Sequence, residues 1–336
     1  MDNQPFVLDN AAQIEIIHCL SEKLRAYYVF PSHAEEICVR LDQHLKDGDY
    51  SEISEGELFA LSLTLDLQAV CHDEHLWVKW HAEQLPEEEG ALRYNPEWQA
   101  QRKLEAELDD YGFHKLELLP GDVGYLDIHY FHRPAWAGDT AVAAMNFIAE
   151  AHALIIDLRG CTGGYPGMIS LVCSYLFGEE PVHLHSIYWR DEDITQQYWT
   201  LPYIPGKRFV DKPVYALISK TTYSAGEAFA SILQTRQRAT LIGEKTDGGA
   251  HPGASYRIHP HFEVFIPIGR VINPLTGTDW EGSGILPDIP VPQEQTFSVA
   301  YRLALESLMK SLGDSPSGAL QALAQEAQNA LNGLEG

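Results

Sequence analysis

The residues best suited to covalent chemistry lie in one short segment, 221–229, which contains Ser224. The apolar run before it, 214–218, is typical of a buried strand, and 225–234 is typical of a helix. We therefore expect Ser224 on a sharp strand-to-helix turn, where the first N–H groups of the helix can stabilise a developing negative charge. This is a common setting for a nucleophilic serine. The alternative is that Ser224 only caps the helix.

A glycine-rich loop forms the second candidate motif. Ile155-Ile156-Asp157-Leu158 indicates a buried strand, and Arg159-Gly160-Cys161-Thr162-Gly163-Gly164 follows it before a predicted helix. Glycines in such a loop let backbone N–H groups approach a ligand closely. No Gly-Lys-Ser/Thr sequence follows, so a nucleotide-binding P-loop is not supported.

Two further segments offer acids and bases, namely His72-Asp73-Glu74-His75 and Trp280-Glu281-Gly282-Ser283-Gly284. A serine hydroxyl is a poor nucleophile until a base within hydrogen-bond reach takes its proton. Imidazole titrates near neutral pH and can act first as base and then as acid to the leaving group. A carboxylate on the other ring nitrogen fixes the tautomer. The chain therefore contains the residue types that an activated serine needs.

The elements that must position these residues follow from hydrophobic periodicity. The first 70 residues predict three amphipathic helices, and 76–80 predicts a short strand. From Val123 onward, strands alternate with helices, which implies a sheet covered by helices and at least partly parallel. Two more helices are expected at 297–312 and 318–334, with a short hinge at 313–318.

We divide the chain accordingly into four regions. Residues 1–83 are expected to form an N-terminal helical cap domain that contributes the base histidine, and 84–120 a polar linker or surface excursion. Residues 121–295 are expected to form the α/β catalytic core, and 296–336 the C-terminal helices.

Composition limits the function further. Formal charge is −25, from 48 acidic and 23 basic residues, which argues against nucleic-acid binding and attraction to anionic membranes. No apolar stretch is long enough for a membrane span, and the N-terminus has no basic region followed by an apolar run. The five cysteines lack CxxC spacing. We expect a reduced, cytoplasmic protein, and the sequence leaves homo-oligomer formation open.

The four motifs, in this order, resemble those of the tail-specific or C-terminal processing family of serine peptidases, which has a crotonase-like fold. The resemblance is strongest to the branch around the interphotoreceptor retinoid-binding protein. It covers roughly residues 26–291 and includes Tyr28-Val29-Phe30-Pro31 near its start. It implies a crotonase-like core of ββα units behind a helical cap.

The resemblance also implies roles for individual residues. Ser224 would be the nucleophile, and Gly163 and Ala225 would supply the oxyanion-hole N–H groups. Many family members use a lysine base in a Thr-x-Gly-Lys pattern, whose last position is occupied here by Gly249. Other branches, including tricorn and a chlamydial protease, use a His–Ser–Glu triad. By that pattern His75 is the general base and Glu281 the carboxylate that orients it.

Alternative residues remain for the base and the site lining. His251 follows the loop that lacks the lysine, and His72 lies three residues before His75. Gly164 and Gly249 are further candidates to line the site. The pairs His183/His185 and His259/His261 have spacings that a metal can use, but no third ligand stands near either pair in sequence. We expect no metal and no cofactor.

The expected reaction is hydrolysis of a peptide bond through an acyl-serine intermediate. Processing proteases of this family usually carry a PDZ domain, and the interval from His75 to Val123 is too short for one. A short peptide, or a small ester or amide, therefore fits as substrate. Two alternatives stay open. One is a non-catalytic carrier of an apolar, retinoid-like or lipid-like ligand. The other is an acyl transferase or peptide-modifying enzyme, in which an amine replaces water.

Overall fold

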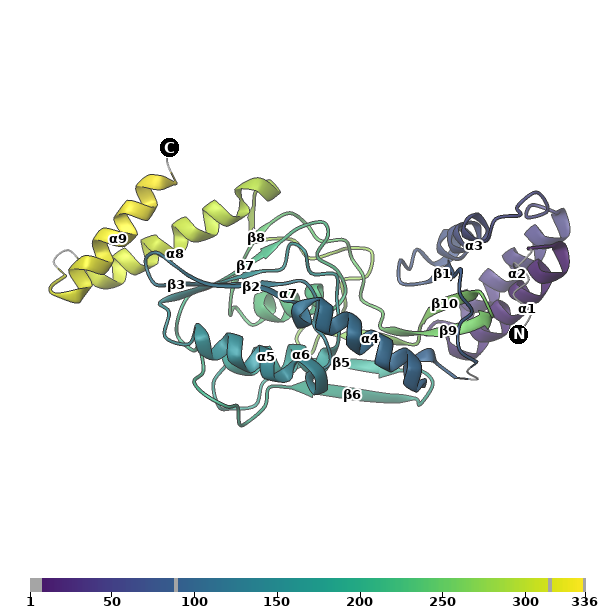
Figure 1. Cartoon of the computed structure of the whole chain (residues 1–336), viewed down its shortest axis with the longest axis horizontal. Coiled ribbons are helices and arrows are strands. Elements are labelled where there is room, and N and C mark those ends of the chain that lie inside the picture. Colours follow the sequence, from purple (N-terminus) through teal and green to yellow (C-terminus); the bar gives the residue numbers. More distant parts are fainter. Residues whose placement is uncertain (1–7, 88–89, 314–315, 335–336) are drawn as a thin grey trace. The chain divides into compact units, whose positions relative to one another are not determined.

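The computed structural model describes residues 8–87, 90–313 and 316–334 (Figure 1). Two predictions fall partly outside this range. The N-terminal residues 1–7, which bear on the expected lack of a signal peptide, and residues 314–315 of the expected hinge are not described. The chain forms two compact units, each assembled from several segments. Unit 1 comprises 1–102, 187–196 and 251–272, and unit 2 comprises 103–186, 197–250 and 273–336.

Three helices begin unit 1, namely α1 (Asn10–Tyr27), α2 (Pro31–Asp47) and α3 (Gly56–Cys71). Their ends follow local sequence. Asp9 accepts the Ala12 N–H at the start of α1, Pro31 begins α2, and Gly48 ends α2 with a φ of +78°. Each helix buries one face in a shared core, which contains Ile16, Ile17, Leu20, Leu24, Ile37, Leu41, Phe59, Leu63 and Leu67.

The sheet of unit 1 joins segments that are far apart in sequence. Its order is β1 (Trp77–Trp80), β10 (Phe262–Pro267) and β9 (Gly253–His259), with both pairs antiparallel. Side chains of β9 alternate between buried and half-buried positions, as expected for a strand with one face on the core. The helices of the expected 1–83 cap therefore belong to a unit that also contains 84–102, 187–196 and 251–272.

Unit 2 contains a six-stranded sheet in the order β12-β8-β7-β4-β3-β2. Its strands are β2 (Phe113–Leu119), β3 (Val123–Ile128), β4 (Ala153–Asp157), β7 (Val214–Ile218), β8 (Thr240–Gly243) and β12 (Ile289–Pro290). The strands from β3 to β12 run parallel, and β2 is antiparallel to β3. β4 is buried along its whole length, as a central parallel strand should be.

Helices cover both faces of this sheet. The helices α5 (Pro134–Phe147), α6 (Pro166–Leu176) and α7 (Ala225–Thr235) follow β3, β4 and β7 along the chain. Figure 1 shows α5 and α6 on the opposite side of the sheet from α8 (Thr296–Leu312), on which α9 (Ala319–Gly333) packs. This is the crotonase-like α/β arrangement that the sequence predicted.

The interval predicted as a linker contains structure of its own. It holds α4 (Pro96–Leu108) between two short 3-10 turns, Leu92–Tyr94 and Asp110–Gly112. Only Ala106 of α4 is buried, which explains why no core pattern marks this helix in the sequence. Within the described part of the interval from β1 to β3 there is no PDZ domain.

A third sheet includes two strands within residues 183–199, an interval for which no strand was predicted from the sequence. Its order is β11-β5-β6, formed by Gly269–Ile272, His183–Trp189 and Ile194–Trp199. The division between the units falls within β5 and β6. The rings of His183 and His185 stack on Trp199 and Tyr198, with centroids 4.6 and 4.8 Å apart. In this arrangement these histidine rings pack against aromatic side chains.

Candidate active site

Ser224 lies on the sharp turn between β7 and α7, as expected. Its φ of 52° and ψ of −115° are unusual for a residue with a side chain, and such a conformation costs about 1–3 kcal/mol. Neighbouring bonds hold the turn: the Tyr223 N–H donates to the Cys161 carbonyl (2.9 Å), and the Thr222 hydroxyl donates to the Leu158 carbonyl (2.8 Å). The loop after β4 therefore fixes the turn that presents the serine.

The glycine loop lies directly against this serine. Gly163 and Gly164 have φ values of +134° and +135°, which favour glycine. A Cβ atom on Gly163 would lie 3.1 Å from the Ser224 Cβ and 3.8 Å from the Ala225 nitrogen. One on Gly164 would overlap the Phe131 carbonyl oxygen at 2.3 Å. The structure thus brings Gly163, Ser224 and Ala225 together; a side chain would strain the backbone at 163 and would clash with Phe131 at 164.

The oxyanion-hole candidates differ in their present hydrogen bonding. Ala225 is the first residue of α7, where N–H groups have no acceptor within the helix. The Gly163 backbone forms a hydrogen bond to the Cys161 thiol, which partly offsets the effect of burial on that thiol. Burial raises the pKa of Cys161 to about 12, so the thiol stays protonated at neutral pH.

Glu227 is a central residue of the site that the sequence analysis missed. Its side chain is fully buried in the first turn of α7. One carboxylate oxygen accepts the N–H groups of Ser224 (3.0 Å) and Gly249 (2.8 Å), and the other accepts the Thr246 hydroxyl (2.5 Å). Burial raises the pKa of Glu227 to about 7, and these hydrogen bonds oppose the shift. The Ser-x-x-Glu spacing predicts a helix cap but not this burial.

The loop at 246–250 and the segment at 280–285 are bonded to each other within unit 2. The Trp280 indole N–H donates to the Gly249 carbonyl (2.9 Å), and the Ala250 N–H donates to the Glu281 carboxylate (2.5 Å). The Ile285 N–H donates to the Thr246 hydroxyl oxygen (2.7 Å). Glu281 therefore lies beside the loop that contains Gly249.

In unit 1 a buried aspartate organises the candidate histidines. Asp73 is only 1% exposed. One of its oxygens lies 2.8 Å from His251 Nδ1 and accepts the Tyr28 hydroxyl (3.2 Å), and the other accepts the backbone N–H of His75 (3.1 Å). His251 and Asp73 thus form an imidazole–carboxylate pair. Asp73 lies within the His72-Asp73-Glu74-His75 motif, but no catalytic role was expected for it.

The three candidate histidines occupy different environments. His75 and His251 are both buried, whereas His72 is exposed. His72 ends α3 in the left-handed conformation, with its N–H bonded to the Gln68 carbonyl (2.9 Å). Burial lowers the pKa of His75 to about 4, and the nearby Asp73 charge opposes that shift. At neutral pH the His75 imidazole is uncharged, as a general base must be.

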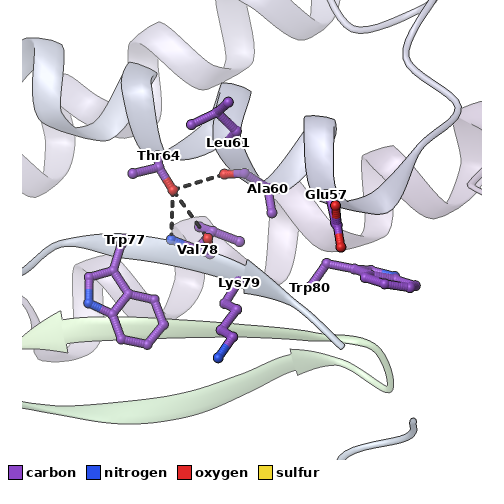
Figure 2. Close-up of a pocket in the computed structure, with 8 residues that line it drawn as sticks. All are labelled: Glu57, Ala60, Leu61, Thr64, Trp77, Val78, Lys79 and Trp80. Carbon is purple, nitrogen blue, oxygen red and sulfur yellow. Dashed lines mark hydrogen bonds between the residues drawn. The ribbon is translucent and has the colours of Figure 1, made fainter. Parts of the chain in front are cut away.

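An apolar groove of about 540 Å³ lies between α3 and β1 in unit 1 (Figure 2). The Thr64 hydroxyl accepts the Val78 N–H (2.9 Å), and its proton has two acceptors, the Ala60 carbonyl (2.8 Å) and the Val78 carbonyl (3.2 Å), so α3 covers the outer edge of β1 there. The residues that line the groove include none of the expected catalytic residues; they are Glu57, Ala60, Leu61, Thr64, Trp77, Val78, Lys79 and Trp80.

Among the described residues, no helix is both long enough and apolar enough to span a membrane.

Family comparisons agree with this architecture. The family model described as Peptidase family S41 matches residues 122–291. The model of the N-terminal domain of Peptidase S41 in eukaryotic IRBP matches residues 8–110. The chain therefore belongs to Peptidase family S41.

Among curated proteins, the chain is similar to carboxyl-terminal-processing enzymes. It is 28% identical to the Carboxyl-terminal-processing protease of Synechocystis sp. over 200 residues, which cover 56% of this chain and 44% of the relative. It is 28% identical to the chloroplastic Carboxyl-terminal-processing peptidase 1 of Arabidopsis thaliana over 191 residues, covering 56% and 37%. The matched region thus spans less than half the length of these relatives.

Solved structures share the fold at low identity. The photosystem II D1 C-terminal processing protease aligns with a TM-score of 0.52 at 13% identity, covering 84% of this chain and 93% of that one. A putative peptidase from Parabacteroides merdae gives 0.57 at 16% identity, covering 87% and 96%. The tricorn protease gives 0.56 at 14% identity, covering 98% and 38%. At these identities the comparisons establish the fold.

Proposed function

We propose that this protein is a serine peptidase that cleaves an amide bond through a covalent acyl-Ser224 intermediate. One observation carries the proposal. Ser224 is held in a strained backbone conformation at the first turn of α7, directly beside Gly163. Such strain persists only where the surrounding structure imposes it, and it is concentrated at functional sites. Membership of Peptidase family S41 supports the same reading.

The reaction follows from the chemistry of a hydroxyl nucleophile. The Ser224 oxygen attacks the substrate carbonyl while its proton passes to an imidazole, and the oxyanion forms beside the Ala225 and Gly163 N–H groups. The imidazolium then protonates the departing amine as the C–N bond breaks. Water, deprotonated by the same imidazole, attacks the acyl-serine and releases the carboxylic acid product.

We assign His75 as the base and Glu281 as its orienting carboxylate, in line with the His–Ser–Glu pattern. The uncharged imidazole of His75 supports this role. The main competitor is His251, because its Nδ1 is already hydrogen-bonded to a buried carboxylate, Asp73. In a triad the second ring nitrogen of such a pair is the one that receives the serine proton. Variants of the two histidines therefore decide the assignment.

The proposed substrate is a peptide bound without a dedicated domain for its C-terminus. The similar proteins are named for carboxyl-terminal processing, but the match covers less than half of their length. The interval from β1 to β3, as far as it is described, holds α4 and β2 in place of a PDZ domain. We therefore expect cleavage of short peptides with little dependence on a free C-terminal carboxylate.

Intact-mass labelling with a fluorophosphonate tests the proposal. We expect one adduct per wild-type chain and none on Ser224→Ala, with His75→Ala labelled far more slowly. A peptide library with free and amidated C-termini then identifies the substrate class. A folded wild-type protein that stays unlabelled, and cleaves no member of the library, would contradict the proposal and favour the ligand-carrier alternative.

A further inference from the structure

The hydrogen bonds of Glu227 suggest a role that a helix cap does not require. An ordinary cap glutamate is solvent-exposed and bonds within its own helix turn. The Glu227 carboxylate is fully buried, and it bonds both to the Ser224 backbone and to the separate loop that contains Thr246 and Gly249. Burying a carboxylate is costly, so an arrangement that retains one points to a specific use.

The contacts of Glu227 link the nucleophile to the rest of the candidate site. The loop it holds continues to Ala250, whose N–H donates to Glu281. The Thr246 hydroxyl donates to Glu227 and also accepts the Ile285 N–H. Ile285 lies four residues after Glu281. Two short paths of hydrogen bonds therefore join the Ser224 turn to the segment that carries Glu281, and both pass through Glu227.

We propose that Glu227 is a positioning residue: its carboxylate sets the distance between the Ser224 turn and the 246–250 loop, and so the orientation of the nucleophile. It acts through the backbone and does not touch the substrate. This inference rests on the proposed role of Ser224. On the loop side, the Gly249 N–H bonds to Glu227.

The Glu227 carboxylate is surrounded by hydrogen-bond donors. The groups that bond to the carboxylate are uncharged: the Thr246 hydroxyl and the N–H groups of Ser224, Gly248 and Gly249. The 245–250 loop and the 280–285 segment bonded to it carry the charged side chains of Lys245, Asp247 and Glu281, and the end of β4 and the loop after it, which packs on α7, carry Asp157 and Arg159. Because each of the uncharged groups bonded to the carboxylate is a donor, the ionised form of Glu227 accepts from all of them, whereas the protonated form holds them less tightly.

Two variants separate length from charge. Glu227→Asp keeps the carboxylate, and aspartate is well tolerated in a first helical turn. It is one methylene shorter and cannot hold both sides at once. Glu227→Gln keeps the length but removes the charge. The matched control is Glu263 on β10, which is also almost fully buried and bonds to Ser255 and His81 within unit 1.

The experiment measures the second-order rate of fluorophosphonate labelling at Ser224 between pH 6 and pH 9, with circular dichroism and thermal unfolding to establish the fold. We expect Glu227→Asp to label at least about tenfold more slowly, which is the effect of losing one charged hydrogen bond. Glu227→Gln should lose less and show no rate change centred near pH 7. Glu263→Asp should stay within about twofold of wild type. A folded Glu227→Asp variant that labels at the wild-type rate would overturn the proposal.

A second measurement does not depend on catalysis. In wild-type protein the amide proton resonances of Ser224 and Gly249 should shift together with one midpoint near pH 7, because both bond to the same carboxylate. The shift should vanish in Glu227→Gln. If the wild type does not label but these amides titrate together, Ser224 is not the nucleophile and the Glu227 link stands. If the two amides do not titrate together, the proposed link through Glu227 is wrong. This outcome is measured on wild-type protein, so it holds even if Glu227→Asp does not fold.

Discussion

The Ser224 turn and the Asp73 cluster hold their candidate catalytic groups in different ways. Ser224 is positioned by the backbone, through positive φ angles, adjacent glycines and a loop that leaves no room for a side chain at Gly164. The histidines of unit 1 are positioned by a side chain, because Asp73 bonds to His251 Nδ1 and to the His75 backbone. Changes at the first region should therefore act through local geometry, and changes at the second through charge and tautomer.

The largest expected effect on turnover comes from the Ser224 region. Ser224→Ala should lower peptide turnover by on the order of 10⁴-fold or more, because the covalent step is lost while the fold is kept. Turnover is measured on a peptide found by the library screen, and circular dichroism checks the fold. If the variant keeps most of its activity, Ser224 is not the nucleophile.

Replacing the histidines sharpens the comparison within unit 1. We expect His75→Ala to reduce turnover by on the order of 10³-fold and His251→Ala to reduce it less. Steady-state kinetics on both purified variants gives the answer. A larger loss for His251→Ala would transfer the role of base to the His251–Asp73 pair.

Variants of Glu281 and Asp73 test which carboxylate orients the base. Glu281→Gln should slow turnover by on the order of 10²-fold and change its pH dependence, since a neutral amide no longer stabilises an imidazolium. Asp73→Asn provides the contrast, because Asp73 contacts His251 directly. If Asp73→Asn is the more damaging change and Glu281→Gln matches wild type, the orienting acid lies in unit 1.

Stability against pH tests the buried acid of the Ser224 region. Burial raises the pKa of Glu227 from 4.5 to about 7, so the folded state binds more protons than the unfolded state between these values. This contribution to stability is present below about pH 4.5 and is lost as the pH rises through about 7. It amounts to about 3 kcal/mol at most. Glu227→Gln should lack this loss.

Urea unfolding of both proteins at several pH values measures the difference. The histidines with lowered pKa values, His75 and His185, change stability in the opposite direction. Because they are present in both proteins, their effect cancels in the difference. A wild-type-minus-variant difference that stays constant from pH 4.5 to pH 8 would mean that Glu227 has an ordinary pKa.

The smallest effect concerns the edge of β1. Thr64→Val removes the hydroxyl that bonds to both backbone groups of Val78, at a cost of about 1–3 kcal/mol in the free energy of unfolding. Thr64→Ser retains the hydroxyl and should stay near wild type. Neither change should alter the labelling rate of Ser224, and a large change in that rate would connect this edge to the catalytic region.

Sequence reasoning placed the Ser224 turn well because its signals are local. A run of five apolar residues precedes it, and a helical pattern follows it, so β7 and α7 lie where they were expected. The strands β5 and β6 were missed, since β6 is mostly exposed and carries no apolar alternation. The strands β9 and β10 complete a sheet with β1 from about 180 residues away, a pairing that no local pattern specifies.

The site was predictable only where the residue type itself indicates the chemistry. Ser224, His75 and Glu281 each carry a group that acyl transfer needs, but it was the resemblance to the His–Ser–Glu pattern that selected these positions among the many histidines and acids, and their roles remain predictions. Glu227 was hidden because an acid in the first turn of a helix is usually a solvent-exposed cap. Asp73 was hidden because its partner His251 is far away in sequence. Burial and long-range hydrogen bonds distinguish these two acids, and neither property can be read from the chain.

The interleaved path of the chain limits how this protein could have been assembled from parts. The backbone passes from one unit to the other after residues 102, 186, 196, 250 and 272. The N-terminal family match ends at residue 110, so it contains β1 without β10 and β9, which make up the rest of that sheet. A gene fragment encoding that match would yield helices whose sheet lacks two strands. Recombination that transferred only this N-terminal segment would therefore separate β1 from the strands that complete its sheet.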